Sequence, residues 1–229
     1  MINQMNQNKY YTEFALRYKD DIINSGNPSL WTSDIINNGP KSVTMKIRID
    51  TLKEIIKEHF SREHEVFDIG CGFGRQAFLL AKGGFKITGV DTNPDFINIA
   101  KEIFKKHSLE GNFHCIEPNG KLADNRFHQI VLLDVLEHIP PFKRKKFISS
   151  VWSVSWPEST LIMSLPIIKP PFRLLFTNFV KYFLSSLLKN KEHPYPIPDE
   201  KSIKRILGKL FKISGIVIHG DTAFYICKS

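Results

Sequence analysis

Short apolar segments alternate with amphipathic ones along residues 60–165 of this 229-residue chain. Where the spacing of apolar residues is helical, it predicts helices, including one that begins at Pro94 and one that begins at Pro141. The apolar segments have the length of buried strands, and they cover 65–69, 86–91, 112–117, 128–133 and 160–165. This alternation is typical of a parallel sheet with helices on both faces.

The last two apolar segments are connected differently. Residues 213–219 and 222–228 are separated only by Gly220 and Asp221, which is too short for a crossover and predicts an antiparallel hairpin. Asp199 has the character of an N-cap for the helix that precedes this hairpin. We therefore predict an α/β fold with a seven-stranded, mostly parallel sheet, helices on both faces and a C-terminal antiparallel hairpin.

The remaining segments suggest how the chain is divided. Apolar residues recur at helical spacing from Tyr11 to Ile22, and a second helix is predicted over 51–59. We predict an N-terminal helical cap over 1–60 and a main domain over 61–229 that contains an insertion at 166–198. Within the insertion, 172–188 has phenylalanines on one side and polar residues on the other, which predicts an amphipathic helix.

The turn after the first predicted strand has a distinctive composition. Asp68 is followed by three alternate glycines, Gly70, Gly72 and Gly74, and then by a helical segment. Glycine has no Cβ, so the backbone can turn sharply and approach a ligand closely. Asp91 ends the next strand, at the spacing from which a nucleotide-binding unit presents a carboxylate to ribose hydroxyls. These features predict a site for an adenosine-containing cofactor.

The residues around the turn separate two classes of cofactor. A dinucleotide fingerprint would require a third glycine where this chain has Arg75. Asp68 would lie unfavourably beside a pyrophosphate but favourably beside the α-ammonium of an amino acid. A nicotinamide-dependent oxidoreductase is therefore the alternative that Arg75 and the terminal hairpin disfavour.

Three motifs occur in order: the acidic residue with its glycines, the segment 89–91 that ends in Asp91, and the segment 134–139. Across roughly residues 60–165 they resemble the class I S-adenosylmethionine-dependent methyltransferases. The similarity is to the small-molecule type that includes the ubiquinone-biosynthesis O-methyltransferases. It implies a Rossmann-like fold, S-adenosyl-L-methionine as cofactor, and methyl transfer to a small or lipid-linked acceptor at oxygen. A non-catalytic subunit with this fold, which activates a partner, is a second alternative.

The resemblance also assigns roles to residues. It places Asp68 near the cofactor ammonium, the three glycines along the methionine moiety, and Asp91 on the ribose. The remaining cofactor contacts would be Glu117 on the adenine amino group, with Asn119 as second candidate, and Leu133 and Asp134 beside the sulfonium.

His138 follows the fourth predicted strand and titrates near neutral pH, which makes it the candidate general base for a hydroxyl acceptor. A structural role for His138 is the alternative. We predict no metal site, because the three cysteines are scattered. Asp134, Glu137 and His138 are neighbours in sequence, but the sequence does not show that they converge.

Charge and hydropathy bear on partners and location. The chain has 32 Lys and Arg residues and 23 Asp and Glu residues. The resulting net charge of +9 favours anionic partners. Its densest run, 143–146, is predicted to be a solvated helix face. We do not expect a nucleic-acid acceptor, because the chain has no base-methylation motif of the Asn-Pro-Pro-Tyr or Pro-Cys kind.

The polar segment 1–10 has no apolar core, and no 18-residue stretch is apolar throughout, so we expect a cytoplasmic protein. Three interpretations remain for the apolar side of 171–190. It packs into the protein's own core, it forms a lid over the acceptor, or it contacts an anionic membrane, which would hold the protein at the inner membrane face.

Overall fold

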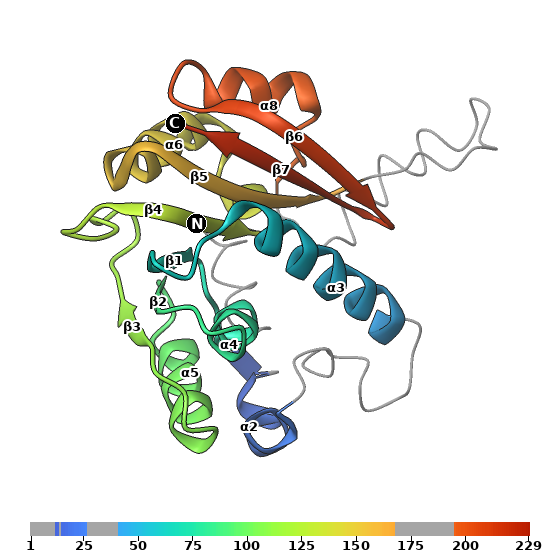
Figure 1. Ribbon diagram of the computed structural model, residues 1–229, viewed down its shortest axis with the longest axis vertical. Helices are drawn as coiled ribbons and strands as arrows, with labels where there is room; N and C mark the ends of the chain where they lie inside the picture. Colours follow the sequence, from blue (N-terminus) through green and yellow to red (C-terminus); the bar gives the residue numbers. More distant parts are fainter. Residues whose placement is uncertain (1–11, 14, 27–40, 168–194) are drawn as a thin grey trace.

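The alternating segments form one seven-stranded sheet in the computed structural model (Figure 1). The structure describes residues 12–13, 15–26, 41–167 and 195–229. The strand order is β3-β2-β1-β4-β5-β7-β6, in which β7 runs antiparallel to both β5 and β6 and the other pairs are parallel. The predicted fold class is confirmed. The strands are β1 (Val66–Ile69), β2 (Ile87–Asp91), β3 (Asn112–Cys115), β4 (Phe127–Leu133), β5 (Ser155–Pro166), β6 (Lys212–His219) and β7 (Thr222–Lys228).

Helices cover both faces of this sheet (Figure 1). One face packs against α2 (Lys19–Ser25), α3 (Lys41–His59), α4 (Arg75–Lys82) and α5 (Pro94–Lys106). The other packs against α6 (Arg144–Ser153) and α8 (Glu200–Leu207). Successive strand residues point to opposite faces, so Val66 and Val131 lie in the first core while Phe67 and Leu132 lie in the second. Both faces are apolar because both are covered.

The strand boundaries differ from the predicted ones where tertiary pairing decides them. β5 begins at Ser155, five residues before the predicted start. Its register with β4 jumps from the pair Phe127–Ser155 to the pair Gln129–Thr160, so residues 156–159 form a bulge. A bulge tolerates Pro157, which cannot donate to a regular ladder. In the other direction, β3 ends at Cys115, two residues before the predicted end.

The helix predicted over 51–59 begins at Lys41 and is therefore ten residues longer. Its first half is attached to the sheet by polar contacts that helical spacing cannot reveal. Arg48 binds Asp134 at the end of β4, and the Thr51 hydroxyl lies 3.0 Å from Nδ1 of His219 at the end of β6. These contacts hold α3 across the ends of the strands.

The basic run 143–146 is only partly solvated. The helix predicted from Pro141 begins as a 3-10 turn, η4 (Pro141–Lys143), and continues as α6. Arg144 is 4% exposed, and its guanidinium donates to the carbonyl oxygens of Leu136, Ile139 and Pro196. The prediction of a solvated face is therefore wrong for Arg144, while Lys143, Lys145 and Lys146 are exposed. The amphipathic helix predicted over 172–188 lies outside the described residues.

Candidate cofactor site and acceptor mouth

The glycine turn joins the end of β1 to α4 and is held against β2. The N–H groups of Gly70 and Cys71 both donate to the carbonyl oxygen of Val90, at 2.8 and 3.0 Å. Gly70 and Gly72 have positive φ angles of 75° and 54°, which disfavour side chains. A Cβ on Gly70 would lie 2.4 Å from Val135, whereas a Cβ on Gly72 would meet nothing within 4 Å. The turn is therefore closely packed at Gly70 and open at Gly72, where a ligand can approach the backbone.

Asp91 is hydrogen-bonded to this turn as well as placed beside it. Its two carboxylate oxygens accept from the N–H groups of Gly72 and Asn93, each at 2.9 Å. Burial raises the pKa of the half-buried Asp91 carboxyl, and these N–H donors oppose the shift. Asn93 in turn caps α5 by accepting from the N–H groups of Asp95 and Phe96. Asp91 thus supports the turn from β2, a role that its sequence spacing does not indicate.

Asp68 lies beneath the turn and is 2% exposed. Within the described part of the chain, its Oδ2 atom has no hydrogen-bond partner. Burial raises the pKa of this carboxyl to about 7, with a further contribution from the charge of Asp91, while the Ala77 N–H acts in the opposite direction. A buried carboxylate oxygen without a partner is costly, and a cation bound beside it would remove that cost.

Asp134 begins the loop after β4, and an ion pair and hydrogen bonds hold it in place. Arg48 of α3 forms an ion pair with its Oδ2 atom. The Ser164 hydroxyl donates to Oδ1 at 2.8 Å and also accepts from the Asp134 N–H at 3.1 Å. Burial alone would raise the pKa of Asp134, but Arg48 and Ser164 outweigh it and hold that pKa below its usual range. The network attaches α3 to the loop after β4.

Glu137 and His138 lie in η3 (Leu136–His138), a 3-10 turn directly after this loop. Glu137 is fully buried, and neither carboxyl oxygen has a hydrogen-bond partner among the described residues. Burial, together with the charge of Asp134, raises its pKa to about 8, so Glu137 is mostly protonated at neutral pH. His138 is half-buried, and its charge contributes to the lowered pKa of Asp134, which places the two side chains near each other. In the described part of the chain, no three His, Cys, Asp or Glu side chains form a metal-binding group.

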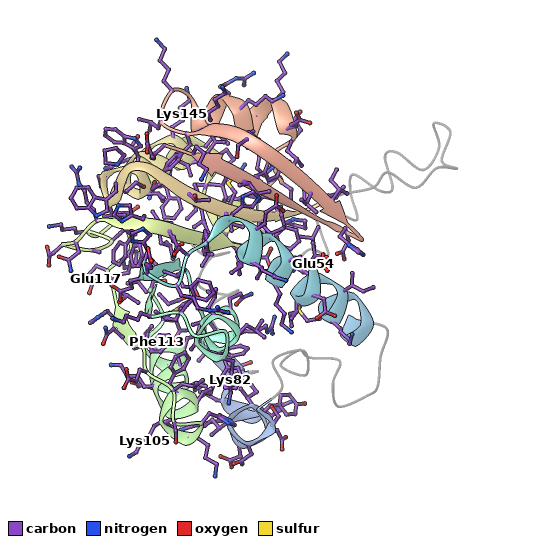
Figure 2. The ribbon with its side chains drawn as sticks, viewed as in Figure 1. Glu54, Lys82, Lys105, Phe113, Glu117 and Lys145 are labelled. Carbon is purple, nitrogen blue, oxygen red and sulfur yellow. The ribbon has the colours of Figure 1, made fainter. Side chains whose placement is uncertain are left out.

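The remaining predicted contacts lie along the same edge of the sheet. The Ile116 N–H donates to the Asp91 carbonyl, which brings the residue before Glu117 to the end of β2. Glu117 is exposed and begins a turn closed by Gly120 (Figure 2). Leu133 ends β4 and is 7% exposed. We use the name carboxyl edge for this end of the sheet, where the carboxyl ends of β1 to β4 lie together. It contains the point where the winding of the sheet reverses between β1 and β4, which is where such sheets bind ligands.

Sequence reasoning did not identify Arg48, Ser164 or the buried state of Glu137. Arg48 and Asp134 are 86 residues apart, and Ser164 is 30 residues beyond Asp134. Of these residues, Ser164 had a usable signal in the sequence. It lies near the end of an apolar strand, and such a serine faces the same edge as the motif residues. Arg48 had no comparable signal within its predicted helix.

Comparison with known proteins gives this arrangement a family context. A family model described as "Methyltransferase domain" matches residues 66–158. The ubiquinone biosynthesis O-methyltransferase of Coxiella burnetii (strain Dugway 5J108-111) is 28% identical over 137 residues, which cover 59% of this chain and 52% of that protein. The protein of the same name from Hydrogenovibrio crunogenus is 33% identical over 94 residues, 38% of this chain and 37% of that one. The chain thus spans about half the length, or less, of these relatives.

Solved structures agree on the fold. An S-adenosylmethionine-dependent methyltransferase from Methanosarcina mazei superposes with a TM-score of 0.62 and 20% identity, covering 76% of this chain and 96% of that one. Magnesium protoporphyrin IX methyltransferase from Synechocystis PCC 6803, solved with bound SAM, gives a TM-score of 0.60 and 18% identity over 83% and 84% of the chains. The fold and the carboxyl edge define a class I methyltransferase architecture. Residues 66–158 match a methyltransferase domain in sequence, and the fold is that of class I S-adenosylmethionine-dependent methyltransferases, so the resemblance seen in the motifs is confirmed.

Proposed function

We propose that this protein is an enzyme that transfers a methyl group from S-adenosyl-L-methionine to a small or lipid-linked acceptor, at oxygen. The buried carboxylate of Asp68, whose Oδ2 atom has no hydrogen-bond partner among the described residues, is the observation that carries the proposal. It is buried beside a glycine turn that is open at Gly72, and it lies close enough to Asp91 for the two charges to interact. A pyrophosphate would be repelled there, whereas the α-ammonium of a methionine moiety would neutralise Asp68.

The residues along the carboxyl edge fit this cofactor. S-adenosylmethionine supplies a methyl group that the positive charge of its sulfonium already activates. Asp68 would bind the ammonium, the backbone of Gly70 to Gly74 would line the methionine moiety, and Asp91 would accept hydrogen bonds from the ribose. Glu117 would bind the adenine amino group. Leu133 and Asp134 would border the reacting centre and exclude water from it.

The acceptor side contains a candidate base. His138 ends η3, the turn that follows the loop after β4, and is close enough to Asp134 for their charges to interact. A neutral imidazole there would take the proton of an acceptor hydroxyl, and Asp134 would stabilise the imidazolium that forms. Transfer to oxygen is also what the names of the Coxiella and Hydrogenovibrio relatives state for those proteins.

Isothermal titration with S-adenosylmethionine and S-adenosylhomocysteine tests the cofactor assignment. We expect saturable binding of both, and weakening by about 1 to 3 kcal/mol in Asp68→Asn because a charged acceptor is lost. Asp124→Asn, in an exposed turn before β4, is the matched control and should bind as the wild type does. Folded protein that binds neither compound, or that binds NAD instead, would contradict the proposal.

We also propose that the protein contacts an anionic membrane, which would give it access to a lipid-linked acceptor. The segment 171–190, whose sequence first suggested this contact, lies outside the described residues, and no helix among the described ones is long and apolar enough to span a bilayer. Support comes from the outer surface of α6 and α8, which pack side by side on one face of the sheet. Phe142 at the start of this surface is 83% exposed, and Trp152 at the end of α6 is 47% exposed.

The same surface has a concentrated positive charge. Residues 143–153 and 199–209 contribute seven exposed cations against two acids, a net +5 in a chain whose total is +9. Near an anionic bilayer each such cation contributes about 1 kcal/mol of attraction, and exposed aromatic rings insert at the interface. The cations are Lys143, Lys145, Lys146, Lys201, Lys204, Arg205 and Lys209.

Co-sedimentation with vesicles tests this contact. We expect binding to phosphatidylglycerol vesicles but not to phosphatidylcholine vesicles, and loss of binding at high salt. The double reversal Lys145→Glu with Lys146→Glu should weaken binding at least about tenfold, and so should Phe142→Ser. Lys105→Glu with Lys106→Glu is the matched control, because Lys105 lies on α5 at the far end of the molecule from Lys145 (Figure 2). Binding to an oligonucleotide but to neither kind of vesicle would contradict the proposal.

A further inference from the structure

A groove lies between α3 and α4 at the end of the sheet opposite to the carboxyl edge, where β1 and β2 begin. Its volume is about 380 Å³. It is lined in part by residues 60–63, which lead from α3 to β1, and by Gly83 and Phe85, which lie between α4 and β2. None of the residues that line the groove belongs to the glycine turn or to the loop after β4.

The floor of the groove is apolar. Leu52, Ile56 and Phe60 come from α3 and the residue that follows it, and Leu80 comes from α4; each is at most 8% exposed. Leu79 and Phe85 complete the walls and are half-buried. Such a lining offers water few hydrogen-bond partners, so an aliphatic group would replace water there favourably.

The rim of the groove is cationic. Lys53, Lys57 and Arg62 line it against one acid, Glu63. Lys53 has a partner, since its Nζ lies 3.5 Å from Asp50. In contrast, no carboxylate of the described chain lies within 4 Å of the Lys57 ammonium, so that charge is available to a ligand.

Arg62 is exposed, but two contacts fix its side chain at this rim. Its Nε donates to the Gly83 carbonyl at 2.7 Å, and its guanidinium carbon lies 5.9 Å from the centre of the Phe85 ring. The guanidinium therefore stands over the apolar wall at the entrance. A planar guanidinium held in this way is well suited to bind a carboxylate.

We propose that this groove is a second ligand site, which binds a single-chain anionic amphiphile of the fatty-acid type. The aliphatic chain would lie on Leu52, Ile56 and Leu80, and the carboxylate would lie between Lys57 and Arg62. The volume is near the lower end of the range of small-molecule pockets, roughly 300 to 1,000 Å³, which suits one chain better than two. The site does not depend on the proposed methyl transfer, because the two sets of residues do not overlap.

Calorimetric titration with dodecanoate and with dodecanol, below their aggregation concentrations, tests both parts of the site. The two compounds share a chain length, so we expect saturable binding of dodecanoate and at least about tenfold weaker binding of dodecanol. Lys57→Glu with Arg62→Glu should weaken dodecanoate binding by about tenfold or more and leave dodecanol unaffected. Leu79→Trp, which fills the groove, should abolish binding of both.

Controls make the result decisive. Lys105→Glu with Lys106→Glu on α5 changes the net charge equally and should leave dodecanoate affinity unchanged. Cofactor affinity and thermal midpoint show that each variant is folded. A groove variant that fails to fold is replaced by Lys57→Gln, whose dodecanoate affinity should fall about threefold. Equal affinities for dodecanoate and dodecanol, unchanged affinity in the double reversal, or no saturable binding of dodecanoate to the wild type would each overturn the proposal.

Discussion

At the scale of single residues, Asp91 combines a structural role with the proposed ribose contact. Its carboxylate accepts from the N–H groups of Gly72 and Asn93, so its removal leaves one donor of the glycine turn and one donor at the start of α5 without their partner. We predict that Asp91→Ala lowers the free energy of unfolding of the cofactor-free protein by about 1 to 3 kcal/mol. Urea denaturation measures this. Unfolding curves that coincide with those of the wild type would show that the carboxylate does not support the turn.

Asp68 should make stability depend on pH in an unusual direction for a carboxyl group. Its pKa is about 7 in the folded protein and about 3.9 in an unfolded chain, so the folded state binds the proton more tightly. The contribution of Asp68 to stability is therefore fully present below about pH 4, declines as the pH rises, and is lost above about pH 7. We predict that Asp68→Asn stabilises the cofactor-free protein at pH 8, by about 2 to 4 kcal/mol.

The pH dependence of that difference provides the check. Denaturation of Asp68→Asn and the wild type at intervals from pH 5 to pH 8 should give curves that separate as the pH rises. Glu137 has a raised pKa in both proteins, so its contribution cancels in the comparison. A difference that is constant with pH would mean that the Asp68 pKa is ordinary. The same substitution should weaken cofactor binding, which would identify a carboxylate retained for binding at a cost in stability.

At the scale of elements, the ion pair between Arg48 and Asp134 positions α3. Both side chains are at most one-third exposed, and Ser164 also donates to the carboxylate. We predict that Arg48→Ala lowers the free energy of unfolding by about 1 to 3 kcal/mol, because a half-buried carboxylate loses its cation. Hydrogen exchange should accelerate along 45–51. Lys46→Ala, whose partner Asp50 is one turn away on the same helix, is the control and should change stability by less than about 0.5 kcal/mol.

Arg144 connects α6 to the loop after β4 and to the segment before α8. It donates to three backbone carbonyls, one of which belongs to Pro196. We predict that Arg144→Ala costs about 2 to 4 kcal/mol of stability, because three carbonyl groups, that of Leu136 buried, lose a charged donor. Lys145→Ala, the exposed neighbour, should cost less than about 0.5 kcal/mol. Thermal or urea unfolding of these two variants shows whether Arg144 is structural or solvated. The sequence of the run 143–146 did not make that distinction.

These elements show what the sequence could and could not predict. Apolar segments and turn residues predicted the sheet, because strand length and the two-residue turn at Gly220 are local properties. The motif spacing predicted which strand ends carry Asp68 and Asp91. The bulge at 156–159, the first half of α3 and the burial of Arg144 were not predictable, because each depends on a contact between residues far apart in sequence.

At the scale of the whole molecule, the two edges of the sheet present different chemistry. Parallel strands end together, so the glycine turn, Asp91, Asp134 and His138 all lie at the carboxyl edge. The opposite edge carries the groove between α3 and α4, with its apolar floor and cationic rim. The helices α3 and α4 connect the two edges, because each contributes residues to the groove and lies beside the candidate site at its other end.

This separation predicts where the cofactor should protect the backbone. With S-adenosylhomocysteine at a hundred times its dissociation constant, we expect about 2.7 kcal/mol of added stability by mass action. Hydrogen exchange measured under conditions of local opening should slow most at 70–75 and 91–93, which surround the turn. Residues 60–64 and 83–86, at the opposite edge, should change least, and dodecanoate should reverse this pattern. Protection by S-adenosylhomocysteine that is strongest at 60–64 would place its site at the wrong edge of the sheet.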